Sequence, residues 1–151
     1  MSDLYKALAS SIYVSRQMLA GQAIETDDQK IRASGLYEDW APGKHEAGEV
    51  YNAEGQTWEC YQSYDNATHP DIKPGTTAWP TFNRPLHGKT RETARPWVAP
   101  THSKDIYKKG EWMVWTDGWL WECIAENGTN FSPEDYSAGW RKDEPEGGMP
   151  V

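Results

Sequence analysis

Cysteine, phenylalanine and long apolar runs are scarce in this chain. It has two cysteines and two phenylalanines among 151 residues. No stretch reaches the roughly 20 consecutive apolar residues that a membrane-spanning helix requires, so the sequence predicts no membrane insertion. With so little phenylalanine, nine tryptophans and eight tyrosines must do the aromatic packing. Each such ring can bury about 150–250 Å², so a few of them can hold a small domain together.

A basic surface is also missing, because the net charge is −8. Nucleic-acid binding requires a positive footprint, so we expect no nucleic-acid partner. The four histidines show no metal-ligand spacing, and no carboxylate pair stands out for glycoside hydrolysis. We therefore predict no metal, no cofactor and no enzymatic activity.

The start of the chain shows none of the features of a secretion signal. It reads Met-Ser-Asp-Leu-Tyr, without the basic leader and apolar run of a signal peptide. Together with two cysteines expected to stay reduced, this predicts synthesis in a cytosol.

The chain does contain an internal repeat, which is marked by tryptophan residues. Trp-Glu-Cys occurs at 58–60 and again at 121–123, and a Gly-Glu pair precedes it at 48–49 and at 110–111. Each copy also has a leading and a closing tryptophan. The sequence therefore predicts one small architecture used twice. The residues expected to form the two cores are Trp40, Trp58, Cys60, Trp79, Trp97, Trp115, Trp121, Cys123 and Trp140.

The two cysteines occupy equivalent positions of the repeat. Each is expected in the core of its own module, as a free, buried thiol rather than as half of a disulfide.

The repeats read as short strands joined by tight turns. Glu54-Gly55 and Asp117-Gly118 predict two hairpins. Because side chains alternate along a strand, Trp119 and Trp121 should share one face. The same argument places Trp115 with Met113, which is why we count Trp115 as core.

The first part of the chain reads as helix instead. An apolar stripe predicts a helix over residues 3–20, and a capping box at Thr26–Gln29 predicts a second, short one that ends near Gly35. This segment has no core of its own, so its stripe must meet the modules, further copies of the chain or a larger assembly. We favour self-association or docking. The residues predicted for oligomerisation are Leu4, Leu8, Ile12 and Leu19.

The predicted fold is mainly β with an α-helical N-terminal segment, and it contains two small tandem three-stranded antiparallel β modules. The expected divisions are a helical segment 1–36, module 1 at 37–84, a linker 85–96, module 2 at 97–141 and a disordered tail 142–151.

The order of these residues is similar to the type-3 chitin-binding modules, which are carbohydrate-binding families five and twelve. The second copy supplies Trp97, Tyr107-Lys108-Lys109-Gly110-Glu111, Gly118-Trp119-Leu120-Trp121-Glu122-Cys123, Ser132-Pro133 and Trp140. The first supplies Trp40, Gly48-Glu49, Gly55-Gln56-Thr57-Trp58-Glu59-Cys60 and Trp79, with Asp71 to Gly75 in place of Ser-Pro. The whole chain resembles small accessory proteins of tailed-bacteriophage virions.

The resemblance implies a small sheet that presents exposed aromatic rings to a polysaccharide. In the family, an aromatic pair follows the hairpin strand. Tyr61 and Tyr64 match that place in the first copy, whereas the second copy reads Ile-Ala-Glu-Asn at 124–127 and has nothing equivalent.

Two further tryptophans have no tryptophan counterpart in the first copy. Trp112 and Trp119 could form a sugar platform, or they could seal contacts between modules or subunits, where tryptophan is also favoured. The predicted carbohydrate-binding residues are thus Trp112, Trp119, Tyr61 and Tyr64.

These observations predict a non-enzymatic virion protein that is assembled in the host bacterial cytoplasm. Its partners would be other virion proteins, copies of itself (a trimer is favoured) and a polysaccharide of the bacterial surface or of mucus, as in host adhesion. The alternative is a purely structural protein, a head decoration or tail piece, whose aromatic surfaces make protein–protein contacts. A third candidate, the targeting fragment of a polysaccharide hydrolase, would need a catalytic domain that this sequence does not contain.

Overall fold

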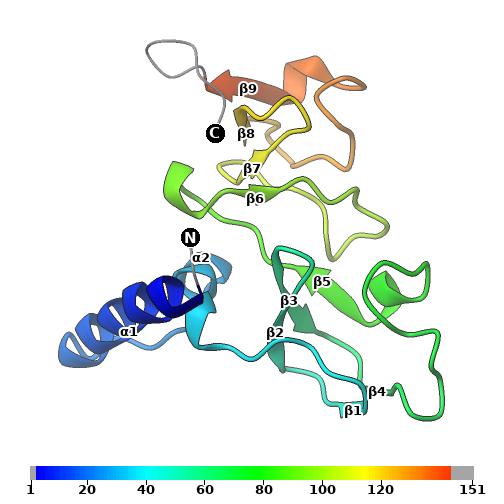
Figure 1. Cartoon of the computed structure of the whole chain (residues 1–151). Helices are drawn as coiled ribbons and strands as arrows, with labels where there is room; N and C mark the ends of the chain where they lie inside the picture. Colours follow the sequence, from blue (N-terminus) through cyan, green and yellow to red (C-terminus); the bar gives the residue numbers. More distant parts are fainter. Residues whose placement is uncertain (1–2, 144–151) are drawn as a thin grey trace. The chain divides into compact units, whose positions relative to one another are not determined.

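The computed structural model describes residues 3–143 and begins with two helices, followed by short strands and turns (Figure 1). Helix α1 (Asp3–Leu19) is followed by Gly21, whose φ of 70° is a left-handed conformation that suits glycine. Helix α2 (Asp27–Arg32) starts at the predicted capping box, in which Thr26 and Gln29 exchange side-chain and backbone hydrogen bonds. Both predicted helices are present, but α2 ends at Arg32, and a separate 3₁₀ helix, η1 (Ser34–Leu36), lies where the second helix was expected to end.

The first module is built on a three-stranded antiparallel sheet. Its strands are β2 (Val50–Ala53), β3 (Gln56–Cys60) and β5 (Asn83–Pro85), in that spatial order. Two shorter strands, β1 (Lys44–His45) and β4 (Tyr64–Asp65), pair beside it. Between β2 and β3 the turn residues Glu54 and Gly55 both have positive φ, at 52° and 75°, as the predicted hairpin turn requires.

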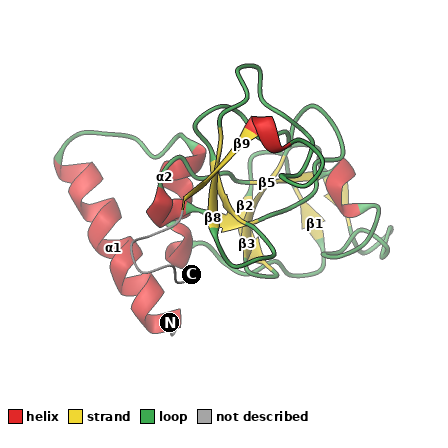
Figure 2. Ribbon diagram, turned by 90° about the horizontal axis from the view of Figure 1, so that it is seen from above, coloured by secondary structure: helices red, strands yellow, loops and turns green. Residues whose placement is uncertain are grey.

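The second module has a four-stranded sheet. Strands β7 (Trp112–Val114), β8 (Leu120–Cys123) and β9 (Trp140–Asp143) are antiparallel, as predicted. A fourth strand, β6 (Arg95–Pro96), adds to β7 in parallel and was not expected. Figure 2 shows how short the strands are and how much of both modules consists of loops. Because short strands contribute few core side chains, large aromatic rings must fill the cores.

Backbone hydrogen bonds show that the two modules repeat one plan. The N–H of Gly48 donates to the carbonyl of Cys60 at 2.8 Å, and the N–H of Gly110 donates to that of Cys123 at the same distance. In each module the cysteine N–H then returns a 2.8 Å bond to the glutamate that follows the glycine. The duplication predicted from the sequence is therefore present in the fold.

The two closing tryptophans, Trp79 and Trp140, were expected at equivalent positions of the repeat, and this prediction is wrong. In the first sheet Cys60 pairs with Asn83, and in the second Cys123 pairs with Trp140. Trp140 therefore occupies the backbone position of Asn83, whereas Trp79 lies four residues before Asn83, in the 3₁₀ helix η2 (Trp79–Thr81). Both rings are buried, so the two cores obtain a closing indole from different places in the chain.

The chain divides after Leu86 into two compact units, residues 1–86 and 87–151. The segment 85–96, expected as a linker, is shared between them. Leu86 is buried and donates its N–H to the Thr57 carbonyl of the first unit at 2.9 Å. In the second unit, the Gly88 carbonyl accepts from Trp112 N–H at 2.9 Å, and the 3₁₀ helix η3 (Arg91–Thr93) leads into β6.

The prediction of a disordered tail over 142–151 is wrong for its first two residues. Lys142 and Asp143 belong to β9, and residues 144–151 lie outside the described part of the chain.

Helix α2 packs on the sheet of its own unit. Lys30 Nζ lies 2.6 Å from Glu59 on β3, and Arg84 on β5 contacts both Asp27 (2.7 Å) and Glu59 (2.9 Å). Burial raises the pKa of the Glu59 carboxyl, but the hydrogen bond from Lys30 and the charge of Arg84 outweigh it, and the net pKa lies below its usual value. The short helix is thus part of the first unit.

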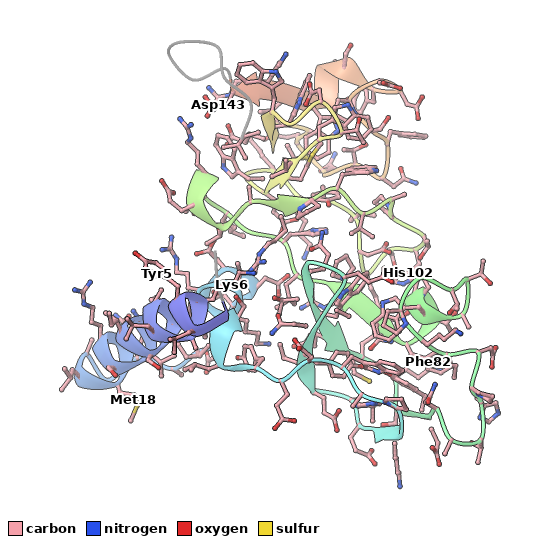
Figure 3. All side chains as sticks on the ribbon, viewed as in Figure 1. Tyr5, Lys6, Met18, Phe82, His102 and Asp143 are labelled. Carbon is pink, nitrogen blue, oxygen red and sulfur yellow. The ribbon has the colours of Figure 1, made fainter. Side chains whose placement is uncertain are left out.

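Aromatic rings fill the core of the first unit. Trp79 makes edge contacts with Trp40 and Trp58, with ring centroids 5.8 and 5.4 Å apart. Tyr51 donates its hydroxyl to the buried Asn83 side chain, so these two polar side chains are paired inside the core. Phe82, labelled in Figure 3, lies in the same unit and packs on Tyr64, with ring centroids 5.3 Å apart.

The second core has the same character. It consists of Tyr107, Met113, Cys123, Ala125 and Trp140, with Trp97, Trp115 and Trp121 packed against it and partly buried. Both cysteines are free and buried, as expected. Four of the predicted core tryptophans, Trp40, Trp97, Trp115 and Trp121, nevertheless keep part of their surface open to solvent.

Candidate functional site

The two tyrosines expected to bind carbohydrate lie in different environments. Tyr64 is only 7% exposed. Its hydroxyl accepts from Trp40 Nε1 at 2.8 Å and is hydrogen-bonded to the Tyr51 hydroxyl at 2.9 Å. Because β4 pairs with β1, the Tyr64 ring turns inward against His45, with centroids 5.2 Å apart. Tyr64 is therefore a core residue, which corrects the prediction that it offers a sugar platform.

Tyr61 is half-buried, and its hydroxyl donates to the Pro80 carbonyl at 2.5 Å. This bond holds the phenol close to its own module. Without Tyr64 beside it, Tyr61 does not form the predicted aromatic pair.

The two surplus tryptophans lie on opposite faces of the second sheet. Trp112 pairs with Glu122, whereas the neighbouring pair, Met113 with Trp121, belongs to the core face. Trp119 accompanies Trp121, because one lysine, Lys142, lies against both rings. Trp112 and Trp119 therefore cannot make one continuous platform.

The structure instead brings Trp119 together with three other side chains at the end of the β7–β8 hairpin. The Lys142 ammonium lies 4.7 Å from the ring centroid of Trp119 and 5.9 Å from that of Trp121. Asp117 Oδ1 accepts from the Trp119 backbone N–H at 2.9 Å and from Trp121 Nε1 at 3.4 Å. Lys142 Nζ is 3.9 Å from Asp117 Oδ2. We call these four residues, Asp117, Trp119, Trp121 and Lys142, the hairpin-tip cluster.

Local sequence explains how the cluster is assembled. Asp117 accepts from the N–H two residues later, a turn geometry that aspartate favours, and Gly118 supplies the positive φ of 81°. Alternation along β8 then directs Trp119 and Trp121 to the same side. Because β9 pairs Lys142 with Trp121, the lysine ammonium reaches both indole rings.

The cluster combines three kinds of recognition group on the surface. Two indole rings, both partly exposed, offer flat apolar faces, the carboxylate of Asp117 accepts hydrogen bonds, and the ammonium of Lys142 donates them. Stacking combined with hydrogen bonding suits small polar ring compounds. These groups can therefore stack on a ligand and exchange hydrogen bonds with it.

The first module has no counterpart of this cluster. Repeat equivalence places Gln56 at the position of Trp119 and Trp58 at that of Trp121, and Trp58 pairs with Pro85 where Trp121 pairs with Lys142. Trp58 is only 7% exposed, and its Nε1 donates inward to the Ala53 carbonyl at 3.0 Å. The same fold position is thus closed in one module and open in the other.

A second surface feature lies on α1. The side of α1 that faces the rest of the first unit carries Ser10. The Ser10 Oγ donates to the Arg32 carbonyl and accepts from the Gly35 N–H, both at 2.9 Å. A side chain at Gly35 would collide with the Lys6 backbone carbonyl, since its Cβ would lie 2.4 Å away. The helix therefore approaches its support closely through these small residues.

The large apolar side chains of α1 point the other way. All four residues predicted for oligomerisation, Leu4, Leu8, Ile12 and Leu19, are exposed, Leu4 and Leu19 at 81% and 90%. Met18, labelled in Figure 3, extends from the same helix into solvent. A helix that shows its large apolar residues to water has a face available for a partner.

One histidine–glutamate pair has the residue types of an acid–base pair. His87 Nδ1 lies 3.0 Å from Glu111 Oε1. The imidazole stacks on the Tyr107 ring, with ring centroids 3.8 Å apart. Both side chains are buried, and Glu111 also accepts from Lys108 N–H at 2.7 Å. The pair is therefore a structural contact of the second core.

Within residues 3–143, no group of three or more histidine, cysteine or acidic side chains is placed to hold a metal ion. In the same part of the chain, no helix combines the length and apolar character needed to cross a membrane.

Sequence reasoning missed three members of the hairpin-tip cluster: Asp117, Trp121 and Lys142. Trp121 was assigned to the core because both copies keep it, and Lys142 was assigned to the tail. The missing signal was the length of the closing strand, which continues past Trp140 and lays Lys142 beside Trp121. Comparison of the chain with models of known protein families and with curated proteins gave no match.

Proposed function

We propose that this chain is a non-enzymatic accessory protein of a bacteriophage virion, which attaches through its N-terminal helices and binds polysaccharide through its second module. The observation that carries the binding role is the hairpin-tip cluster, in which two indole rings lie at the surface with a carboxylate and an ammonium. Its closed counterpart in the first module indicates that this surface is not required by the fold.

The physical basis is the two-sided chemistry of a pyranose. Its C–H face is apolar and stacks on an indole, while its hydroxyls need hydrogen-bond partners. Trp119 and Trp121 can supply the stacking surface, and Asp117 can accept from a hydroxyl. A single shallow site of this kind binds weakly, and several copies of the chain on one particle would raise the affinity by avidity.

The attachment role rests on α1. Its exposed leucines and isoleucine would leave water on contact with a partner, and this transfer contributes roughly 25 cal/mol per Å² of apolar surface. Further copies of the same chain are the partner we favour, with a trimer as the preferred assembly.

Glycan binding is tested by titrating the protein with oligosaccharides of chitin, bacterial cell wall and mucin while tryptophan fluorescence is followed. We expect a saturable change with at least one of them. Trp119→Ala should weaken that binding at least tenfold, about 1.4 kcal/mol. Trp112→Ala, on the opposite face, is the matched control and should bind as the unmodified chain does.

The purely structural alternative is favoured by one observation, that Trp112 is also partly exposed, on the face away from the cluster. If Trp112 seals a protein contact, Trp112→Ala will change the sedimentation coefficient of the assembly and leave glycan titrations unaltered. Absence of any glycan response in the unmodified chain, together with such a change, would replace our proposal by the structural one.

Attachment is tested separately. Leu8→Lys with Ile12→Lys places two charges on the exposed face of α1, away from the hydrogen bonds that Ser10 of this helix makes with Arg32 and Gly35. We expect sedimentation to show monomers at concentrations where the unmodified chain is oligomeric. Unchanged sedimentation would remove α1 from the interface.

A further inference from the structure

The hairpin-tip cluster already holds a ligand-like group, the ammonium of Lys142. It lies against the faces of two indoles and 3.9 Å from a carboxylate oxygen. Aromatic rings attract cations through the negative charge of their π faces, and tryptophan does so most strongly. Aromatic cages bind alkylammonium groups in this way, and the carboxylate of Asp117 adds the attraction of an opposite charge.

We propose that this cluster recognises a protonated amine carried by a glycan, such as the 2-amino group of a sugar that lacks its N-acetyl group. Lys142 then acts as a built-in occupant that the ligand displaces. This inference rests on the proposed function, because it names the chemical class of sugar that the same site takes.

Once the Lys142 ammonium has been displaced from the rings, the charge left in the cluster is that of Asp117, and electrostatics favours an amine over an acidic sugar. An ionised sugar carboxylate brought to the indole faces would approach Asp117, and the chain as a whole carries a net charge of −8, which attracts cations and repels anions. An N-acetyl group is neutral, so it cannot reproduce the interaction that the rings and Asp117 make with a positive charge. The site should therefore distinguish an amino sugar from its acetylated form.

The position of Lys142 allows displacement. Its stem reaches the rings from β9, and its side chain is 31% exposed, so the ammonium can move into water while the strand stays paired with β8. Because Lys142 is tethered, it competes with any ligand as if present at high local concentration. Removing its charge should therefore improve the binding of an external amine.

The test compares the glucosamine tetramer with the N-acetylglucosamine tetramer at pH 6, where the sugar amines carry substantial positive charge. Binding is followed by tryptophan fluorescence for the unmodified chain and for Lys142→Met. We expect the unmodified chain to prefer the glucosamine tetramer. Lys142→Met should bind that tetramer at least fivefold more tightly and should bind the acetylated tetramer no more tightly than before.

Arg141→Met is the matched control, because it removes the same charge from the adjacent residue on the opposite face of β9, where Arg141 is paired with Glu122. It should leave both affinities unchanged. Asp117→Asn should lower glucosamine affinity at least fivefold, and raising the pH to 9 should abolish the preference because the sugar amine loses its proton. Near-ultraviolet circular dichroism of each variant establishes that the aromatic cores remain intact.

Two results would overturn the inference while the proposed function stands: equal affinity for the two tetramers, or weaker glucosamine binding in Lys142→Met. A gain of affinity for a glucuronic acid oligomer over both tetramers would replace the amine by an acidic sugar. If neither tetramer binds to any variant, and no other glycan does, both the inference and the proposed function fail.

Discussion

The two modules share one backbone plan but treat the tips of their hairpins differently. In the first module, Trp58 is buried and Pro85 lies beside it, and in the second Trp121 is partly exposed beside Lys142. Equivalent positions can therefore complete a core or make a surface. The difference teaches that repeated residues establish the fold, whereas the residues that differ between copies mark where a module can acquire a separate role.

The opposite faces of the two sheets differ as well. Both carry a cross-strand ion pair at equivalent positions, Glu59 with Arg84 and Glu122 with Arg141. In the first unit α2 covers the pair, and Arg84 is 21% exposed, but Arg141 is 62% exposed. The covered pair attaches a helix to a sheet, and the exposed pair lies in water.

The largest effect we expect is from deleting the closing indoles. Trp79→Ala and Trp140→Ala each remove a buried ring that packs on other aromatic rings, so each should lower the free energy of unfolding of its unit by about 3–5 kcal/mol. Urea unfolding followed by fluorescence measures both. A loss below about 1 kcal/mol for either variant would show that the two rings are not equivalent in the energetics of their cores.

The next largest effect separates the covered ion pair from the exposed one. Arg84→Met leaves Asp27 and Glu59 without their shared cation, and we expect a loss of about 2 kcal/mol, part of the penalty for breaking a buried pair because solvent reaches this one. Arg141→Met, the matched change in the second unit, should leave stability unaltered. Urea midpoints of the two variants give the comparison, and equal midpoints would remove the distinction between covered and exposed pairs.

A smaller effect is expected when pH is lowered. The pKa of Glu59 is depressed in the folded chain, against the effect of burial, because Lys30 and Arg84 stabilise the charged form. Its contribution to stability is therefore present above its unfolded pKa of about 4.3 and is lost as pH falls through the lower, folded value. Glu59→Gln should flatten this loss of stability as pH falls below about 4.3, measured by urea unfolding.

Glu122→Gln supplies the control for that pH dependence, since the same substitution is then made in the exposed pair. A flattening as large as that of Glu59→Gln would contradict the assignment to the covered pair.

The smallest effect concerns the two thiols, where the modules should behave alike. Burial raises the pKa of both Cys60 and Cys123, so less reactive thiolate is present at a given pH. We expect both to react with Ellman's reagent at pH 8 about 100-fold more slowly than in the unfolded chain. Fast reaction of one cysteine alone in the folded protein would show that one core opens more readily than its repeat.

Much of the fold could be predicted because its signals are local. The capping box at Thr26, the glycine after α1 and the two hairpin turns each act within a few residues. The repeat of Trp-Glu-Cys added the long-range information that one plan occurs twice. The parallel strand β6 carried no such signal, because two residues pair there with a strand far along the sequence.

The candidate site was harder to predict than the fold. Tyr64 looked free from its place after a strand, but pairing of β4 with β1 turned it into the core. Trp112 and Trp119 looked like a pair because neither has a tryptophan counterpart in the first copy. The strand register places them on opposite faces of the sheet. Exposure of a ring depends on what packs over it, and packing partners are set by contacts that lie far apart in sequence.

The sequence by itself determined which elements form and that the modules are duplicates, since turns, caps and repeated indoles act through short-range geometry. Only the tertiary structure decided which indole faces stay open and which residues gather at the end of the second hairpin. The reason is that β9 begins 17 residues after Cys123 (123 to 140) and places Lys142 over Trp119 and Trp121. Strand pairing across such a distance in sequence depends on the whole core of the module.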